Sequence, residues 1–475
     1  MTARVFWSQL LISILVSETW AFKAAVYEHV QQGNPFNETR EAVVGKNLAA
    51  YTEAAKKAAD EQVDIIVFPE GGIMFSFAKW DDVNKTAEDV PDAGAVPCVD
   101  KKANMPVLTN LSCLAKENQI YVVANLVDKK PCKHGPCPEH NTTFYNTNVA
   151  FDRNGTLISR QPCRCRHRYH MNHVSAAPFM SDADPPEFAV FETDFGERVG
   201  MFICFDVLFG EASELVTRHN VTLAVTSTWW LDELPGLYAV AVQQAWSLRH
   251  AVPLLAANIQ KPQVGSLGSG IYAGIRGPLN YTYSPDGLPK LLVASIDETP
   301  NNSRYSGDVV RPDKLHYLNR DNRRYISVAL WNPVGKYRAC HGDFCCTLRY
   351  RTSQILDNLF LFAFDGYDRF EKFSDLRVQR CIVAVCEEPG VNECNKFSTK
   401  SRTKFTEFQL EAQFRTAEVF PLLASNELEL TPKRHWMFET TSANVSALTM
   451  NKGNPSGEPL LQATLFARLY EDRKL

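Results

Sequence analysis

The sequence predicts an α/β domain over residues 22–300 and a smaller, strand-rich domain over residues 323–475. Strand and helix patterns alternate in the first part, which is typical of α/β folds. A polar stretch with Pro312 then predicts a linker over residues 301–322. Beyond it, short alternating segments predict strands, and six cysteines predict disulfides that hold them together.

The α/β prediction begins with three consecutive elements. Phe22–Val30 has the pattern of a strand, and Lys46–Gln62 carries apolar residues at helical spacing. Asp64–Phe68 is a short apolar strand that Pro69 closes. Strand, helix and buried strand in this order predict a βαβ unit.

Similar patterns recur along the chain. Asn154-Gly155 predicts a tight turn between two strands of a hairpin. The remaining strands are predicted at Tyr121–Val127, Asn146–Phe151, Thr156–Ser159, Val199–Cys204, Leu223–Thr226, Val252–Ala257, Gln379–Val385, Phe405–Phe414 and Gln462–Tyr470, with helices at Leu208–Arg218 and Leu237–Arg249.

Composition excludes two broad classes of protein. Hydrophobic residues make up 45% of the 475 residues and charged residues 22%, so the chain can form a sizeable core and is not disordered. Lys plus Arg total 50 against 54 Asp plus Glu, a net charge of -4. This balance gives no electrostatic reason to expect a nucleic-acid partner.

The first 21 residues have the pattern of a secretory signal peptide. Arg4 supplies the positive start, Val5–Val16 is mostly apolar, and Thr19–Ala21 offers small residues for cleavage. A buried N-terminal strand or helix is the less favoured alternative. The apolar run is shorter than the about 20 residues needed to span a bilayer. Thr464–Leu475 is charged and lacks the hydrophobic tail of a lipid-anchor signal. We therefore expect a soluble, secreted, extracellular protein with no membrane anchor.

Glycosylation sequons agree with that expectation. Each Asn-X-Ser/Thr pattern is weak evidence alone, but glycosylation requires a secreted chain. The nine sequons are at Asn37, Asn84, Asn110, Asn141, Asn154, Asn220, Asn280, Asn301 and Asn444.

The 13 cysteines form an early group of six and a late group of six, with Cys204 alone between them. In an oxidising compartment each group can pair within its own domain and leave one thiol. The pairing stays open, because six cysteines allow 15 connectivities. The early group is Cys98, Cys113, Cys132, Cys137, Cys163 and Cys165; the late group is Cys340, Cys345, Cys346, Cys381, Cys386 and Cys394.

A zinc site is the alternative use of these cysteines. Three pairs have four residues between them, a spacing that zinc sites also use. Secretion favours disulfides, so we expect no metal. The three pairs are Cys132 with Cys137, Cys340 with Cys345, and Cys381 with Cys386.

Two candidate chemical groups follow predicted strands, where functional groups of α/β sheets gather. Glu70 follows one strand in FPEGG, and Cys204 ends another in FICFD, directly before a predicted helix. The positive end of the helix dipole lowers the pKa of a thiol at this position and so favours the thiolate. A nearby carboxylate can take up the thiol proton and pass it to a leaving amine, as covalent acyl transfer requires. The plainer alternatives are a small buried cysteine and a loop or capping glutamate.

Three motifs resemble the signatures of the nitrilase (carbon-nitrogen hydrolase) superfamily, in its order. They are FPEGG with Glu70, RYH at Arg168–His170 and FICFD with Cys204. Further segments are similar to the vanin and biotinidase branch. They are GMFICFDVLFGE, AWSLRH at Ala245–His250, AANIQKP at Ala256–Pro262, GSGIYA at Gly268–Ala273, the cysteines from Cys340 to Cys346, and FARLYE at Phe466–Glu471.

The resemblance implies an α-β-β-α sandwich with a second domain packed on it. It also implies a Glu-Lys-Cys triad that cleaves amides without metal or organic cofactor. Glu70 matches the general base, and Cys204 matches the nucleophile that forms a thioester. The substrates implied are small vitamin amides, either pantetheine or biotinyl amides such as biocytin.

The sequence departs from the family pattern at the catalytic lysine. Met171 follows Arg168–His170 where this branch has that lysine, and no lysine lies between Lys133 and Lys261. Loss of a group that stabilises the oxyanion costs roughly 10²- to 10³-fold in rate. Neighbouring cations could compensate, or this basic segment could be a solvated loop. The candidate compensating cations are Arg168, His170 and His173.

Two functional hypotheses therefore stay open. The first is a secreted amidase, impaired by Met171, and the second is an inactive pseudoenzyme with a binding role. A Cys-His protease using His170 has only residue types in its favour. Trp229 and Trp230 follow a predicted strand, where they could line a substrate pocket or belong to the core.

Overall fold

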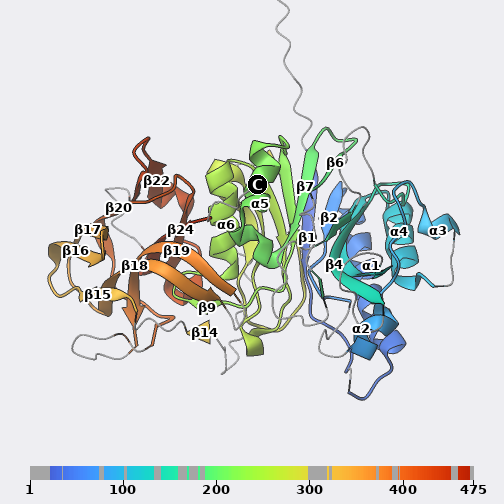
Figure 1. Ribbon diagram of the computed structural model, residues 1–475, viewed down its shortest axis with the longest axis horizontal. Helices are drawn as coiled ribbons and strands as arrows, with labels where there is room; N and C mark the ends of the chain where they lie inside the picture. Colours follow the sequence, from blue (N-terminus) through green and yellow to red (C-terminus); the bar gives the residue numbers. More distant parts are fainter. Residues whose placement is uncertain are drawn as a thin grey trace, which may run out of the picture.

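The computed structural model describes residues 22–34, 36–73, 80–100, 104–132, 141–158, 168–170, 180–181, 188–297, 318–319, 324–370, 374–387, 394, 396–450 and 458–470. Figure 1 shows an α/β domain, coloured blue to yellow-green, beside a strand-rich domain coloured orange to red. Several predictions lie outside the described residues. They concern the signal peptide over residues 1–21, Met171, His173, Asn301 and most of the linker.

Among the described residues, the first domain contains two six-stranded sheets. In the first sheet β1, β2 and β3 run parallel and antiparallel strands flank them. All three residues of β2 are buried, as expected for a parallel strand covered on both faces. The order is β13 (Lys290–Ser295), β1 (Lys23–Glu28), β2 (Ile65–Val67), β3 (Tyr121–Pro131), β4 (Thr142–Phe151) and β5 (Arg168–His170).

The second sheet repeats this plan. Its central strands β10, β8 and β7 are parallel, and antiparallel strands lie on either side. The order is β12 (Pro278–Thr282), β11 (Ser269–Ala273), β10 (Pro253–Ala257), β8 (Leu223–Ser227), β7 (Arg198–Ile203) and β6 (Ala189–Glu192).

Strand alternation explains how the layers stack. Ala24 and Val26 of β1 pack in one core with Met201 and Ile203 of β7, between the two sheets. Ala25 faces the other way, into a second core with helix residues. The helices α1 (Arg40–Asp60) and α4 (Pro106–Asn118) cover the first sheet, and α5 (Gly210–Thr217) and α6 (Ala239–His250) lie on the second. The predicted α-β-β-α sandwich is confirmed (Figure 1). Short helices α2 (Trp80–Thr86) and α3 (Pro97–Asp100) complete this domain.

Two predicted helices begin elsewhere in the structure, and one predicted strand does not form in the part of the chain that the structure describes. The helix α1 begins at Arg40 rather than Lys46, because the side chain of Thr39 caps it by accepting from the Ala42 amide at 3.3 Å. The predicted helix Leu208–Arg218 is the helix α5, which begins only at Gly210 because Phe209 is extended; Leu208 ends a separate 3-10 helix η1 (Cys204–Leu208).

The predicted strand Thr156–Ser159 does not form in its described residues, 156–158. The carboxylate of Asp152 accepts from the Asn154 and Thr156 amides at 2.9 and 2.8 Å, which closes a tight turn. Only an isolated bridge between Phe151 and Leu157 follows it. Backbone hydrogen bonds from Asp152 to the Thr156 carbonyl and from Ile158 to the Ala150 carbonyl, both 3.0 Å, flank that bridge. The predicted turn at Asn154-Gly155 therefore forms, but the described ladder beyond it is too short to be a strand.

The described part of the second domain forms two five-stranded antiparallel sheets. Burial alternates along β17, as expected for a strand with one face toward a core. The predicted strands near residues 379, 405 and 462 are confirmed as β19, β20 and β24. One sheet is β15 (Ile326–Ala329), β18 (Asn358–Phe370), β19 (Ser374–Cys386), β24 (Leu460–Arg468) and β21 (Val419–Ser425); the other is β16 (Val334–His341), β17 (Phe344–Thr352), β20 (Phe405–Gln413), β23 (Val445–Met450) and β22 (Trp436–Thr440).

The late cysteines pair within the second domain, as predicted. The bonds are Cys340–Cys345, Cys346–Cys381 and Cys386–Cys394. In the first domain Cys98 pairs with Cys113, Cys132 is also disulfide-bonded, and Cys204 keeps its thiol. The zinc alternative is wrong for Cys132, Cys340, Cys345, Cys381 and Cys386, because all five are in disulfides and a disulfide sulfur is not a thiolate ligand.

The two domains share a buried interface. The helix α6 packs on β21, and the Tyr238 hydroxyl donates to the Leu423 carbonyl. Trp246, Phe420 and Phe466 contribute apolar surface to the same core. A short parallel pair joins β9 (Glu233–Leu234) to β14 (Leu318–Asn319), so part of the predicted linker pairs with the first domain. Among the described residues, no helix combines the length and apolar character needed to cross a membrane.

Candidate active site

Glu70 lies just beyond the end of β2, in a position set by the strand and by Pro69. Its side chain is buried, with 8% of the residue exposed. The side-chain amide of Asn146 donates to Oε1 at 2.7 Å, and the backbone N–H of Trp229 donates to Oε2 at 2.9 Å. Both carboxylate oxygens are therefore held by neutral donors, which fix the orientation of the group.

The glycines after Glu70 are required by their surroundings. Gly71 has a φ of 63°, which favours glycine. A Cβ at Gly72 would lie 2.0 Å from the hydroxyl oxygen of Tyr51, so a larger residue does not fit. This accounts for the EGG sequence: the loop must turn sharply against α1 to leave the carboxylate at the strand end.

A buried asparagine network lies beside Glu70. Asn125 of β3 donates to the side-chain oxygens of Asn146 and Asn148 at 2.8 and 3.1 Å, and accepts from the Gly71 amide at 3.0 Å. Asn148 in turn lies 3.5 Å from the Phe202 carbonyl oxygen on β7 of the other sheet. Hydrogen bonds therefore connect the loop of Glu70 with the strand that ends at Cys204, and such buried networks fix geometry.

Cys204 directly follows β7, at a sharp corner of the chain. Its φ is 44°, in the left-handed region that is uncommon for residues other than glycine, and its side chain is half-buried. In the parallel register Ile203 is opposite Ser227, whose hydroxyl donates to the Phe68 carbonyl at 2.7 Å. The carboxyl ends of β2, in one sheet, and of β7 and β8, in the other, therefore lie at the same end of the two packed sheets. This arrangement brings the segments of Glu70 and Cys204 together.

The two tryptophans differ in their surroundings. Trp230 is buried, and its indole N–H donates to the Leu237 carbonyl at 3.0 Å, so it belongs to the core. Trp229 is half-buried beside Glu70, and Lys261 Nζ lies 5.6 Å from the centre of its ring. Of the two, Trp229 is the partly exposed one beside Glu70, and the cation of Lys261 lies close to its ring.

The RYH motif forms the edge strand β5. His170 pairs with Thr147 of β4, next in sequence to the Asn146 that donates to Glu70. The backbone of the motif therefore lies beside the candidate site. The side chains of Arg168 and His170 lie outside the described residues, as do Met171 and His173.

A neutral histidine lies behind the Glu70 loop. Burial lowers the pKa of His29 to about 4, and hydrogen bonds to Asn47 and to the Gly72 backbone oppose this effect. The contact between His29 Nε2 and Asn47 Oδ1 is 2.7 Å. At neutral pH this ring is therefore uncharged, and it acts as packing and hydrogen-bonding support for the loop.

Sequence reasoning missed the asparagines at residues 125, 146 and 148, together with Ser227. All four are fully or almost fully buried, and Asn125 is a lone amide in the apolar part of β3, whereas Asn146 and Asn148 lie in a strand that also contains three threonines. An isolated amide within YVVANLV is such a signal, because a buried polar group needs a specific partner.

The predicted glycosylation sites lie in different environments. Asn37, Asn141, Asn154 and Asn220 are exposed. Asn280, in β12, donates its side-chain amide to the Val293 carbonyl at 3.1 Å. Sugar attachment itself stays a prediction, best supported at the four exposed positions.

Comparison with known families decides the relationship. Residues 24–271 match the family described as carbon-nitrogen hydrolase, and residues 315–473 match the vanin C-terminal domain. The chain belongs to the vanin and biotinidase branch of the carbon-nitrogen hydrolase (nitrilase) superfamily. The exact domain boundaries at residues 300 and 322 stay predictions.

Relatives along nearly the whole chain agree with this assignment. Human pantetheinase is 33% identical over 479 residues, covering 95% of this chain and 89% of the relative. A biotinidase from Takifugu rubripes is 29% identical over 506 residues, covering 97% of both chains. An amidase structure from Nesterenkonia sp. aligns at 18% identity with a TM-score of 0.41, over 59% of this chain and 92% of that one.

Proposed function

We propose that this member of the vanin and biotinidase branch is a secreted amide hydrolase. It cleaves the linear carbon-nitrogen bond of pantetheine or of a biotinyl amide such as biocytin, through a thioester on Cys204. One observation carries the proposal: the strand ends that hold Glu70 and Cys204 meet at one edge, with the Glu70 carboxylate held by Asn146 and Trp229. Relatives named pantetheinase and biotinidase supply the substrate classes.

The chemistry divides into acylation and deacylation. In acylation, Glu70 accepts the thiol proton while the sulfur of Cys204 attacks the amide carbonyl. The tetrahedral intermediate collapses, the carbon-nitrogen bond breaks, and Glu70 gives the proton to the leaving amine. In deacylation, Glu70 takes a proton from water, the hydroxide attacks the thioester, and the acid leaves as Cys204 regains its proton. Trp229 lies where it can pack on the substrate body.

Met171 lowers the rate in this proposal. The family lysine supplies positive charge as the oxyanion forms, and a thioether does not. Arg168, His170 and His173 are the nearby cations in sequence that can replace part of that charge. The same substitution favours the second candidate, a pseudoenzyme that binds a ligand without turnover.

The decisive experiment measures hydrolysis of pantetheine and of biocytin by the protein purified from culture medium. N-terminal sequencing of that protein, expected to begin at Phe22, tests the signal peptide and secretion. The assay compares wild type with Cys204→Ala and Met171→Lys. Met437→Lys is the matched control, because Met437 is exposed on β22 of the other domain.

Slow activity that disappears in Cys204→Ala supports the proposal. In Met171→Lys we expect an increase of roughly 10²- to 10³-fold, which Met437→Lys does not reproduce. Activity gained only in Met171→Lys identifies a pseudoenzyme on an otherwise complete site. No activity in any variant, with folding verified by circular dichroism, contradicts the amidase.

A further inference from the structure

A second cavity lies in the C-terminal domain, away from the candidate active site. Its volume is about 810 Å³. Residues of both sheets line it, from the β16–β17 hairpin, β18, β19, the end of β20 and the segment that follows β20. This volume is within the range of about 300–1,000 Å³ that is typical of pockets for small molecules.

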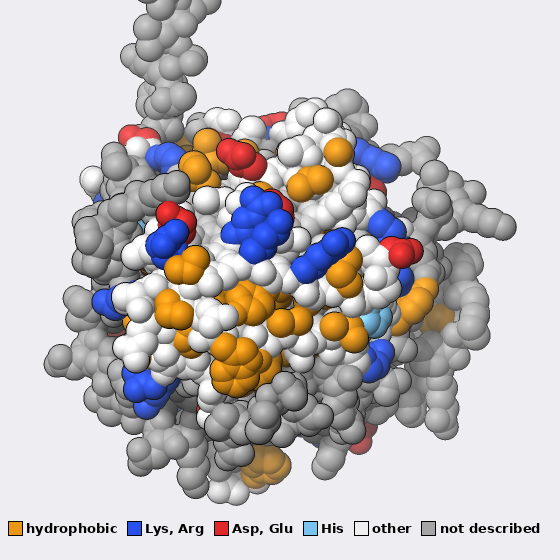
Figure 2. All heavy atoms as spheres, turned by 90° about the vertical axis from the view of Figure 1, so that its left-hand side faces the viewer, with side chains coloured by type: hydrophobic (Ala, Val, Ile, Leu, Met, Phe, Trp, Pro, Cys, Tyr) orange, Lys and Arg blue, Asp and Glu red, His pale blue; other side chains and the backbone are white. Residues whose placement is uncertain are grey.

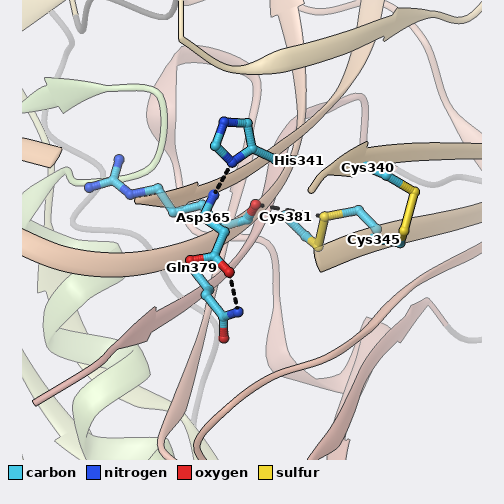
Figure 3. Close-up of a disulfide and its surroundings, with 8 residues drawn as sticks. Cys340, His341, Cys345, Asp365, Gln379 and Cys381 are labelled. Carbon is cyan, nitrogen blue, oxygen red and sulfur yellow. Dashed lines mark hydrogen bonds between the residues drawn. A yellow bond between two sulfur atoms is a disulfide. The ribbon is translucent and has the colours of Figure 1, made fainter. Parts of the chain in front are cut away.

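One wall is an ordered group of polar side chains around Asp365. Arg377 Nη1 lies 2.6 Å and Arg415 Nη2 2.5 Å from Asp365 Oδ1. Gln379 donates to Asp365 Oδ2 at 2.9 Å and accepts from the Arg415 amide at 2.8 Å. Figure 3 shows Asp365 with Gln379 on one side and His341 on the other. Two guanidinium groups share one carboxylate, so this group carries a net positive charge.

Further donors line the same cavity. His341 Nδ1 accepts from the Asp365 amide at 3.2 Å, so in the neutral ring Nε2 carries the hydrogen, and Figure 3 shows that nitrogen pointing away from Asp365. Within the described part of the chain Arg338 makes no hydrogen bond or ion pair, and its side chain is exposed. The carboxylate of Glu411 is already near Arg349, at 3.9 Å. The exposed carboxylate of Asp343 also lines the cavity, so positive charge is not spread over the whole lining but is local to Arg338 and to the Arg377–Arg415 pair.

The rest of the lining is partly apolar. The rings of Phe344 and Phe414 lie with their centres 5.2 Å apart and their planes tilted by 59°, and Val445 is also in the lining. Figure 2 shows the end of the molecule formed by this domain, where Lys and Arg side chains are interspersed with apolar ones. A molecule with both an anionic group and an apolar body matches such a lining.

Disulfides make this cavity rigid. Cys340–Cys345 joins the two strands of the hairpin that carries Arg338 and His341. Cys346–Cys381 joins β17 of one sheet to β19 of the other, beside Gln379 (Figure 3). Both walls are therefore held at a set spacing before a ligand arrives, which lowers the entropy cost of binding.

We propose that this cavity binds a small organic anion with an apolar body. The carboxylate or phosphate group pairs with Arg338 and with the Arg377–Arg415 pair, and the body lies toward Phe344, Phe414 and Val445. This binding is independent of the amidase proposal, because none of its residues belongs to the candidate active site.

Isothermal titration calorimetry on the full secreted protein tests the cavity with three probes. 3-Phenylpropionate has the charge and the apolar body, 3-phenylpropanamide has the body alone, and acetate has the charge alone. The variants are Arg338→Gln and Arg415→Gln, both at exposed positions where folding is little affected. Lys336→Gln is the matched control, because it removes one positive charge from β16 outside the lining.

We expect 3-phenylpropionate to bind at least about tenfold more tightly than either other probe, and each arginine variant to weaken it about tenfold. Lys336→Gln should leave its affinity unchanged. Three results overturn the proposal. They are no saturable binding below about 10 mM, equal binding of the amide or of acetate, and equal weakening by Lys336→Gln.

Discussion

Glu70 and Asp365 are two carboxylates at places where two sheets meet, and their surroundings differ. Two neutral groups donate hydrogen bonds to the Glu70 carboxylate: the Asn146 side-chain amide and the Trp229 backbone N–H. Guanidinium groups of Arg377 and Arg415 hold Asp365. The two neutral donors orient the Glu70 carboxylate, whereas the two guanidinium groups compensate the charge of Asp365 and make it part of a scaffold.

The two regions also differ in what keeps them rigid. Around Glu70 the asparagine network of β3 and β4 does so through buried hydrogen bonds. Around Asp365 the disulfides Cys340–Cys345 and Cys346–Cys381 cross-link strands and sheets. We therefore propose that the region around Glu70 serves catalysis and the region around Asp365 serves binding. Removing the carboxylate charge of Glu70 or of Asp365 tests the role of each region.

Glu70→Gln has the largest expected effect. The amide keeps the size of the side chain but cannot take up the thiol proton, so kcat/KM for amide hydrolysis should fall by about 10²- to 10⁴-fold. The unfolding midpoint should change little. The comparison is made in Met171→Lys if the wild type is too slow to measure. If the Glu70→Gln variant hydrolyses the amide as fast as its parent, Glu70 is not the general base.

Glu28→Gln tests a buried carboxyl group in the first domain. Burial raises the pKa of Glu28 from 4.5 to about 7, while Lys290, Ser269 and the Gly268 amide act in the opposite direction. Its folded-state pKa is raised, so its contribution to stability is complete below pH 4.5 and is lost as the pH rises through about 7. Glutamine has no such loss. Between these pH values the unfolding free energy of the variant should improve relative to wild type by about 3 kcal/mol.

Urea titrations of wild type and variant at pH 4.5 and pH 8 measure this difference. Glu439→Gln, at an exposed position of β22, controls for the loss of one carboxyl group. A difference between wild type and Glu28→Gln that stays constant with pH would contradict the raised pKa.

Asp365→Asn has the smallest expected effect and is the counterpart of Glu70→Gln. Amide hydrolysis should stay within about twofold of the parent, because Asp365 belongs to the other domain. The unfolding free energy should fall by about 1–3 kcal/mol, since Arg377 loses a charged partner in a half-buried position. Differential scanning calorimetry measures it. A large loss of hydrolysis in a folded Asp365→Asn variant would remove the distinction between the two regions.

Much of the fold could be predicted from local patterns. The apolar strand before Glu70, the strand before Cys204 and the strands β19, β20 and β24 all follow from their apolar residues, although burial alternates along β20 and is nearly continuous along β24. Predictions failed where a short-range contact competed with periodicity. Thr39 begins α1 earlier than predicted, and the extended backbone of Phe209 makes α5 begin later than predicted.

The candidate site was predictable only in part. Motifs at strand ends indicated Glu70 and Cys204, because a strand end is visible in the sequence. The donors to Glu70 were not indicated, since Asn146 is 76 positions away and Trp229 is 159 positions away. Which amide reaches a carboxylate depends on the packing of two sheets.

The sequence by itself determined the α/β and strand-rich domains and the family, and it indicated the two residues proposed for thioester chemistry, Glu70 and Cys204. These follow from local periodicity and contiguous motifs. Only the tertiary structure decided which cysteines pair, which groups hold Glu70, and that a cavity lined by Arg338, Arg377 and Arg415 forms between the C-terminal sheets. The physical reason is that these features are contacts between distant strands, and their geometry exists only once the sheets have packed.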